Sequence, residues 1–433
     1  MAPEEREALH APRGRVRPVT ALALAVALAV PGVLLRLTGA EPRQWVAALA
    51  FGLAVVGAAF VLSWAAEVVQ LDISAGLALA LLALVAVLPE YAVDFVFTWK
   101  AGQDPEAYAP LALANMTGGN QLLVGVGWSM VVLLAAWRLR SRHAPNGAGR
   151  PDPGVHLDRS HSVELAFLAL ATAYGLTLPL FRTVKPFDTV VLVTIFVAYV
   201  ARIGRVPTEE PELVGPALLV GTLPTRRRRQ ATALMFAASA GVILLCAEPF
   251  AEALVDTGRE LGVDEFLLVK WLAPLASEAP ELLVAGMFAW RLDTGSALGT
   301  LVSAKVNQWT LLVGTLPVVF MVSSGTAHGL PVDALQRQSL FVTAAQSAFA
   351  VALMTNRRLG VRGAATILAM FLAQSVLTGA LPGSVRGEAH VMIGATYLVL
   401  AAITLWRERA LPTLLHDGLR ASPAELAAAE PER

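Results

Sequence analysis

Charged side chains are scarce in this chain of 433 residues, since Asp, Glu, Lys and Arg together make up 15% of it, whereas soluble globular proteins average about 25%. A chain of this length could bury a large core, but its surface would still need charge to face water. Hydrophobic residues account for 56% of the chain, and the mean hydropathy is +0.62. The composition therefore argues against a soluble protein and favours a membrane protein.

Cysteine is almost absent too. Cys246 is the single one, so no intramolecular disulfide can form. No thiol or histidine cluster indicates a soft metal, and the equal numbers of acidic and basic residues, 33 each, give no indication of nucleic-acid binding. An HExxH motif and a pair of catalytic aspartates, as in intramembrane proteases, are also lacking. We expect neither an enzyme nor a cofactor.

Long apolar runs are what the sequence has in place of charge. Runs of about 18 or more apolar residues are typical of membrane-spanning helices. The predicted segments are 19–36, 45–69, 74–99, 109–137, 162–181, 186–203, 230–255, 264–290, 295–322, 338–354, 363–381 and 390–406. The predicted fold is an all-α polytopic membrane protein with about twelve transmembrane helices.

The distribution of lysine and arginine predicts how these spans are oriented. Basic residues gather in the N-terminal tail, in the connections 138–161 and 202–229, and after the last span. Cytoplasmic loops are enriched in Lys and Arg, and twelve spans place all these segments on one side. We therefore expect a multi-pass protein of the inner or plasma membrane with both termini cytoplasmic. Arg greatly outnumbers Lys and Ala is abundant, which is typical of a GC-rich bacterial genome.

The chain is accordingly divided into two membrane halves and three polar segments. These are a cytoplasmic N-terminal tail (1–18), a first half (19–203), a cytoplasmic basic loop (204–229), a second half (230–406) and a cytoplasmic C-terminal tail (407–433).

The two halves share a sequence motif, within 74–137 of the first and 264–322 of the second. The Pro-Glu pairs of the two copies are 191 residues apart and the Asn-Gln pairs 187 residues apart. The first copy reads Leu88-Pro89-Glu90 and then Asn115-Met-Thr-Gly-Gly-Asn120-Gln121; the second reads Ala279-Pro280-Glu281 and then Lys305-Val-Asn307-Gln308. Each repeat contains five predicted helices, an odd number, so the second is inverted relative to the first. Inverted repeats place a transport site near the bilayer midplane, and the first and last spans flank them.

Each Pro-Glu pair lies inside an apolar run. A charged carboxylate at mid-membrane costs about 2.5–3.5 kcal/mol on insertion scales, so Glu90 and Glu281 need a cation, a proton or a polar cavity. Proline kinks or breaks a helix and frees carbonyl oxygens. Hard cations such as Ca²⁺ and Na⁺ bind carboxylate, amide and carbonyl oxygens, and Asn115, Asn120 and Asn307 supply amides. Instead of binding a cation, Glu90 and Glu281 could be structural carboxylates paired with a lysine. The asparagines could form hydrogen bonds between helices.

These segments resemble the two alpha-repeats of the calcium/cation antiporter superfamily, the sodium/calcium exchanger-like membrane proteins. Its members carry a Pro-Glu segment on one helix and an Asn-rich segment on the next, in each of two inverted five-helix halves. The resemblance covers roughly 45–381. It implies that Glu90 and Glu281 are the metal ligands at the centre of a cation site, with Asn115, Asn120 and Asn307 alongside.

Other polar side chains near the motif are candidates for accessory ligands or proton-coupling groups. Asp94 lies one turn after Glu90, and Glu278 nearly one turn before Glu281, so each shares a helix face with its neighbour. Lys305 is either a built-in cation paired with an acid or a lysine that snorkels to a surface. Because burial readily changes the protonation of a lysine, it favours proton coupling. The full accessory set is Asp94, Ser277, Glu278, Ser303, Lys305 and Thr117.

The predicted function is secondary antiport of Ca²⁺ or another cation against Na⁺ or H⁺. The alternatives are a Na⁺(K⁺)/H⁺ antiporter that does not carry calcium, and a degenerate, non-transporting member that acts as a sensor or scaffold. The expected partners are inorganic cations and the lipid bilayer, nucleic acid is not expected, and the sequence assigns no oligomeric state.

The predicted topology is tested with reporters placed in the two long connections. A reporter in 138–161 and one in 202–229 should both be active on the cytoplasmic side, because both segments are rich in arginine. Reporters on opposite sides would contradict the count of spans.

Overall fold

The structure of the protein is a computed structural model, which describes residues 18–72, 88–141, 154–205, 213, 215–381 and 383–427. Several predicted features lie outside these residues. They are the first part of the third predicted span (74–87), most of the N-terminal tail, parts of both long connections and the last residues of the C-terminal tail.

Nearly all of the described chain is helical. In the first half the helices are α2 (Pro18–Thr38), α3 (Gln44–Val69), α5 (Leu88–Gln103), α6 (Pro105–Leu122), the π-helical η1 (Leu123–Trp128), α7 (Ser129–Ser141), η2 (Arg159–His161), α8 (Ser162–Gly175), η3 (Leu178–Leu180) and α9 (Pro186–Ile203). In the second half they are α10 (Pro216–Gly221), α11 (Thr225–Leu261), α12 (Glu265–Arg291), α13 (Thr294–Asn307), the π-helical η4 (Gln308–Leu312), α14 (Val313–Ser324), α15 (Ala334–Leu353), α16 (Val361–Ala380), α17 (Gly383–Glu408), α18 (Leu411–Arg420) and α19 (Pro423–Ala427).

The all-helical prediction agrees with this architecture. Within the described ranges, 10 helical stretches are long and apolar enough to cross a membrane. The segments predicted at 74–99 and 338–354 correspond to α5 and α15, which are not in that set. The twelve-span count and the inversion of the repeats therefore stay predictions.

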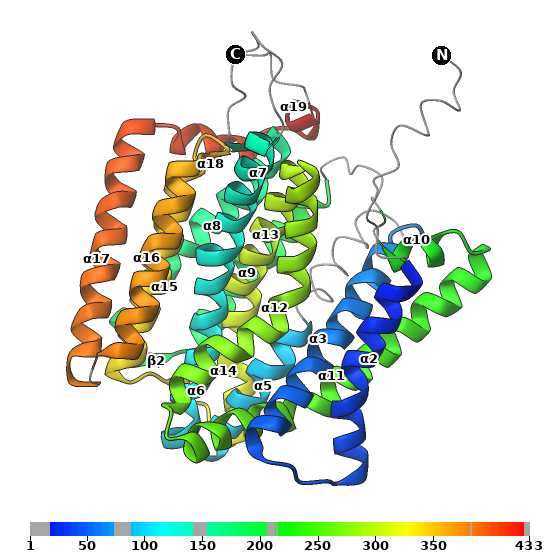
Figure 1. The fold of residues 1–433 in the computed structure, drawn as a ribbon. Coiled ribbons are helices and arrows are strands. Elements are labelled where there is room, and N and C mark those ends of the chain that lie inside the picture. The colour runs from blue at the N-terminus through cyan, green and yellow to red at the C-terminus, as the bar shows by residue number, and fades with distance from the viewer. Residues whose placement is uncertain are drawn as a thin grey trace.

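Helices α2, α3 and α11 form a group beside the main bundle, as Figure 1 shows. One cluster of buried apolar residues joins α3 and α11 to α5, α6 and α12. A larger one fills the bundle from α6 through α9 and from α12 through α18. Helices α6 and α12 contribute to both clusters, so they lie where the two groups of helices meet.

The outer helices present apolar side chains on their exposed surface. Leu24 on α2, Val190 on α9, and Met392 and Trp406 on α17 are each at least 60% exposed. A soluble protein rarely exposes so many large apolar side chains together, whereas lipid tails accommodate them. Their positions agree with the membrane location predicted from composition.

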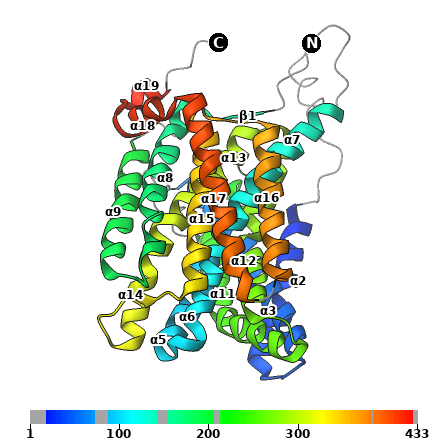
Figure 2. The same cartoon turned by 90° about the vertical axis from the view of Figure 1, so that its left-hand side faces the viewer.

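Two short antiparallel strand pairs connect loops from different halves of the chain. Strand β1 (Val155–His156) pairs with β4 (Arg358–Leu359), and β2 (Thr183–Val184) pairs with β3 (Leu330–Pro331). Strand β2 lies at the lower end of the bundle in Figure 1 and β1 at the upper end in Figure 2. At each end of the bundle, backbone hydrogen bonds therefore join a loop of the first half to a loop of the second half.

The basic connection before the second half is partly helical, since α11 begins at Thr225, before the predicted 230. Arg228 and Arg229 bind the carboxylate of Asp72, just after α3, at 2.8 and 3.1 Å. The hydrogen bonds from Arg228 lower the pKa of Asp72 to about 2. These arginines thus attach the start of α11 to the end of α3, besides any effect on topology.

The C-terminal segment, predicted only as a tail, contains helices α18 and α19. Leu414 on α18 is fully buried in the main core. Arg159 donates to both carboxylate oxygens of Asp417 at 3.0 and 2.8 Å, and Arg202 donates to the backbone carbonyls of Gly418 and Ala421. Figure 2 shows α18 and α19 at the same end of the bundle as β1.

Replacement of Asp417 should release this docked segment. The hydrogen bonds from Arg159 hold the pKa of Asp417 below its usual value, so the pair is intact at neutral pH and is lost as the pH falls through that lowered pKa. Asp417→Asn should cost about 1.5–3 kcal/mol locally. Hydrogen exchange should then speed up in residues 411–427 and leave α3 unchanged. Equal exchange in both proteins would contradict the docking role.

Candidate cation-binding site

Helix α12 carries three of the candidate residues on an unbroken helix. It runs from Glu265 to Arg291 through Pro274 and Pro280, so the Pro-Glu pair does not break the helix here. A proline cannot donate to the carbonyl four residues earlier. The carbonyls of Lys270 and Ala276 therefore lose their helical partners, as expected of prolines in a transmembrane helix.

The helices after the Pro-Glu segments share an unusual feature in the two halves. The π-helical η1 begins at Leu123, two residues after Gln121, and the π-helical η4 begins at Gln308. Short π-helical segments inside α-helices are frequent at functional sites. The sequence repeat thus has a local structural counterpart.

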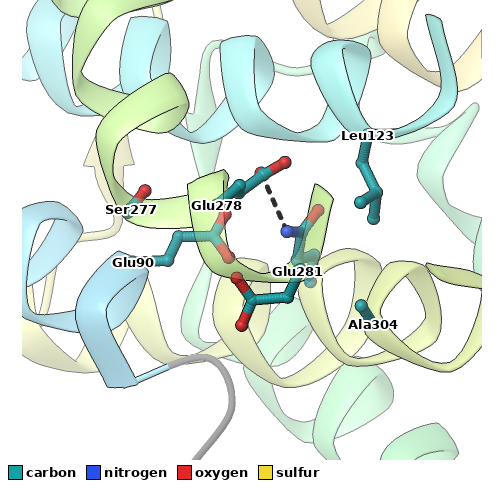
Figure 3. A pocket seen from close by; sticks show the side chains of 7 residues that line it. Glu90, Leu123, Ser277, Glu278, Glu281 and Ala304 are labelled. Atoms are coloured by element: carbon teal, nitrogen blue, oxygen red, sulfur yellow. Dashed lines mark hydrogen bonds between the residues drawn. The ribbon is translucent and has the colours of Figure 1, made fainter. Parts of the chain in front are cut away.

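Residues from both halves of the chain line a small pocket inside the bundle. Glu90 of α5 lines it together with Glu278 and Glu281 of α12, and Figure 3 shows the three carboxylates gathered at one place. The remaining lining residues are Leu123, Ser277, Ala304 and Gln308. Glu90 and Glu281, although 191 positions apart in the sequence, therefore face one cavity.

Four of the six carboxylate oxygens of this pocket have no hydrogen-bond donor among the described residues. Within the described ranges, neither carboxylate oxygen of Glu90 has a partner, and one oxygen each of Glu278 and Glu281 has none. Glu90 and Glu278 are only 3% exposed. An acceptor buried without a donor is costly, and a proton, a cation or a buried water molecule would remove that cost.

Two glycines of α6 allow it to pack closely on α12. A Cβ atom at Gly119 would lie 2.8 Å from Glu278 Oε1 and 2.9 Å from Glu90 Oε1. At Gly118 it would lie 1.9 Å from the carbonyl oxygen of Lys270, the one that Pro274 leaves without a helical donor. The two carboxylates thus approach each other across the backbone of Gly119.

Asp94 and Asn115 form a second polar pair beside the pocket. The side-chain amide of Asn115 donates to Asp94 Oδ1 at 2.7 Å. Both side chains are buried, and Asp94 Oδ2 and Asn115 Oδ1 have no donor in the part of the chain that the structure describes. The pair therefore adds two more acceptor oxygens that face no donor, one turn of α5 away from Glu90.

The other two predicted asparagines are engaged by donors from the opposite half. Lys305 Nζ donates to Asn120 Oδ1 at 2.7 Å, and the Tyr91 hydroxyl donates to Asn307 Oδ1 at 2.9 Å. Neither asparagine lines the pocket. Asn120 and Asn307 thus link the two halves by hydrogen bonds, and in this conformation their amide oxygens do not point into the pocket.

Two of the predicted accessory residues lie away from the pocket. Ser303 donates to Glu164 of α8 at 3.5 Å, and Thr117 contacts Ser339 of α15 at 3.1 Å. Ser277 does line the pocket, and its hydroxyl donates to carbonyls of its own helix. Helical rotation explains the difference, since neighbouring positions on one helix face different partners.

Gln308 is the residue that the sequence reasoning missed. It lines the pocket and donates to Glu278 Oε1 at 2.9 Å, while no described residue donates to its own Oε1. Its place in the Asn-Gln pair was the signal, but Gln121, its counterpart, faces Thr343 and Gln374 instead. Lys270 of α12, another buried lysine, donates to Ser339 at 3.2 Å.

The carboxylates do not form a ready-made metal centre. Among the described residues, no three Asp, Glu, His or Cys side chains are placed to hold a metal ion. Ca²⁺ takes 6–8 oxygen ligands at 2.3–2.6 Å, so side chains must rotate or helices must shift for these oxygens to surround one ion.

A family model described as sodium/calcium exchanger protein matches residues 43–204 and 231–406. The chain is 37% identical to a solved H⁺/Ca²⁺ exchanger, CAX, covering 92% of this chain and 98% of that one with a TM-score of 0.84. It also shares its fold with native YfkE (13% identity, 88% and 99% covered, TM-score 0.56) and with the sodium-calcium exchanger NCX_Mj (14%, 83% and 100%, TM-score 0.50). No curated protein matches the chain.

A methyl group at Gly119 should weaken cation binding without unfolding the protein. In Gly119→Ala the new Cβ pushes apart the flexible ends of Glu90 and Glu278, so ⁴⁵Ca²⁺ binding to the purified protein should fall while thermal stability changes little. Gly118→Ala should instead destabilise the protein, because its Cβ meets the α12 backbone. Gly241→Ala, with no atom within 4 Å of its Cβ, is the control. Undiminished binding by Gly119→Ala would contradict the placement of the site.

Proposed function

The chain belongs to the sodium/calcium exchanger family, and we propose that it is a secondary antiporter that exchanges Ca²⁺ for protons across a membrane. The observation that carries the proposal is the set of buried acceptor oxygens without donors on Glu90, Glu278 and Glu281. Carboxylate and amide oxygens are the ligands that Ca²⁺ prefers.

Protons are the proposed counter-ions because the same oxygens must be neutral when Ca²⁺ leaves. An unpaired buried carboxylate is costly within a membrane, and a carboxylate that takes up a proton removes that cost. Binding of Ca²⁺ and of protons to one set of carboxylates is mutually exclusive, which is the basis of exchange. The 37% identical relative is named an H⁺/Ca²⁺ exchanger, which supports this choice over Na⁺.

Access to the site from either side requires that helices move past one another. We propose that α3 and α11, which with α2 form the group beside the main bundle (Figure 1), move relative to α6 and α12. They occupy corresponding places in the two predicted inverted repeats, and alternating access in such folds is a rocking or sliding of one group of helices against the other. The apolar cluster they share with α5, α6 and α12 is the contact along which they would move.

The alternatives from the sequence lead to different ion fluxes. A Na⁺(K⁺)/H⁺ antiporter would move monovalent cations in a pH gradient without carrying ⁴⁵Ca²⁺. A non-transporting member would bind cations without flux. The three carboxylates in one pocket favour a divalent ion over these alternatives.

The proposal is tested with the purified chain in liposomes. An imposed pH gradient should drive ⁴⁵Ca²⁺ uptake, and a Na⁺ gradient of the same size should not. Glu90→Gln and Glu281→Gln should each reduce the uptake at least about tenfold, since loss of one charged ligand costs ~1.4 kcal/mol or more of binding.

Glu106→Gln is the matched control, because Glu106 is an exposed carboxylate in the first turn of α6. It should transport like the unmodified protein. Uptake that follows the Na⁺ gradient would replace protons by Na⁺ in this scheme, and ²²Na⁺ flux without ⁴⁵Ca²⁺ flux would overturn it.

A further inference from the structure

Lys305 is a fully buried lysine in the middle of the bundle. Its ammonium group donates to Asn120 twice, to Oδ1 at 2.7 Å and to the backbone carbonyl at 3.1 Å. It also lies 4.8 Å from the centre of the Trp309 ring. The amide of Asn120 is held in place by its own donation to Met116 O at 2.9 Å, so Oδ1 remains directed at Lys305.

The lysine borders the cation pocket without forming an ion pair. The neighbouring Ala304 lines the pocket together with Glu278 and Glu90. Among the described residues, however, no carboxylate oxygen lies within 4.0 Å of its Nζ. The amino group of Lys305 thus lies near the acids and donates to neutral oxygens.

We propose that the Lys305 ammonium is a tethered cation that occupies a monovalent-cation position beside the pocket and so makes the antiporter indifferent to Na⁺. The inference rests on the proposed exchange of Ca²⁺ for protons. The position is defined by the two oxygens of Asn120 and by the nearby carboxylates, and oxygens of these types also suit Na⁺.

The repeat supports a specific role for the charge. The residue at the repeat-related position of the first half is Gly118, which has no side chain, so the shared helix geometry does not require a lysine there. A structural bond to Asn120 needs only a neutral donor. A buried ammonium is more costly than a neutral amide, unless its charge offsets that of nearby carboxylates.

The test measures equilibrium ⁴⁵Ca²⁺ binding to the purified full-length chain, with either NaCl or choline chloride added. In the unmodified protein the two salts should have the same effect. Lys305→Gln keeps a donor for Asn120 and removes the charge, and Lys305→Gly introduces the residue of the first repeat. For both variants, the affinity for Ca²⁺ should be at least about threefold lower in NaCl than in choline chloride.

Two lysine variants serve as controls. Lys305→Arg retains the charge and should stay indifferent to Na⁺. Lys270→Gln removes another fully buried lysine, which binds Ser339 at 3.2 Å and does not line the pocket, and it should also stay indifferent to Na⁺.

Two results would overturn the inference. One is displacement of Ca²⁺ by Na⁺ in the unmodified protein, which requires no variant to fold. The other is Ca²⁺ binding by Lys305→Gln that is as insensitive to Na⁺ as in the unmodified protein. If the unmodified protein binds no Ca²⁺ in either salt, the proposed function fails instead.

Discussion

Buried acceptor oxygens that have no donors are the constraint on which the structure of this protein depends. Glu90, Glu278 and Asp94 lie in the interior of a helix bundle, and each has at least one carboxylate oxygen with no partner among the described residues. Within a membrane such groups need a proton, a cation or a polar cavity. Such a site binds either a cation or protons, and an exchanger requires two ions that replace each other at one site.

The close approach of the α6 and α12 backbones determines where these carboxylates lie. Gly118 and Gly119 bring α6 so close that a single methyl group would collide with the carbonyl of Lys270 or with the two carboxylates. Pro274 removes the helical donor of that same carbonyl. Small residues on one helix and proline on the other thus create the close approach that places charge at mid-bundle, as small residues do in other membrane helix pairs.

The two halves are alike in sequence but not in contacts. Asn120 and Asn307 each accept a hydrogen bond from the other half, one from a lysine and the other from a tyrosine. Gln308 donates into the pocket, whereas Gln121 joins a polar network with Thr343 and Gln374. The second half thus supplies two of the three pocket carboxylates and the amide that binds one of them, and the first supplies the glycines that let them meet.

The sequence alone determined the membrane class, the helical architecture and the exchanger family, because sparse charge, long apolar runs and an internal repeat are all visible in one dimension. It could not distinguish Ser277, which lines the pocket, from Ser303 and Thr117, which face α8 and α15. It did not place Gln308 in the pocket, and it predicted only a tail where α18 packs against the core. Only the tertiary structure decided these points, because the rotation of each helix and the partner it packs against determine where a side chain points, and neither is encoded in local spacing.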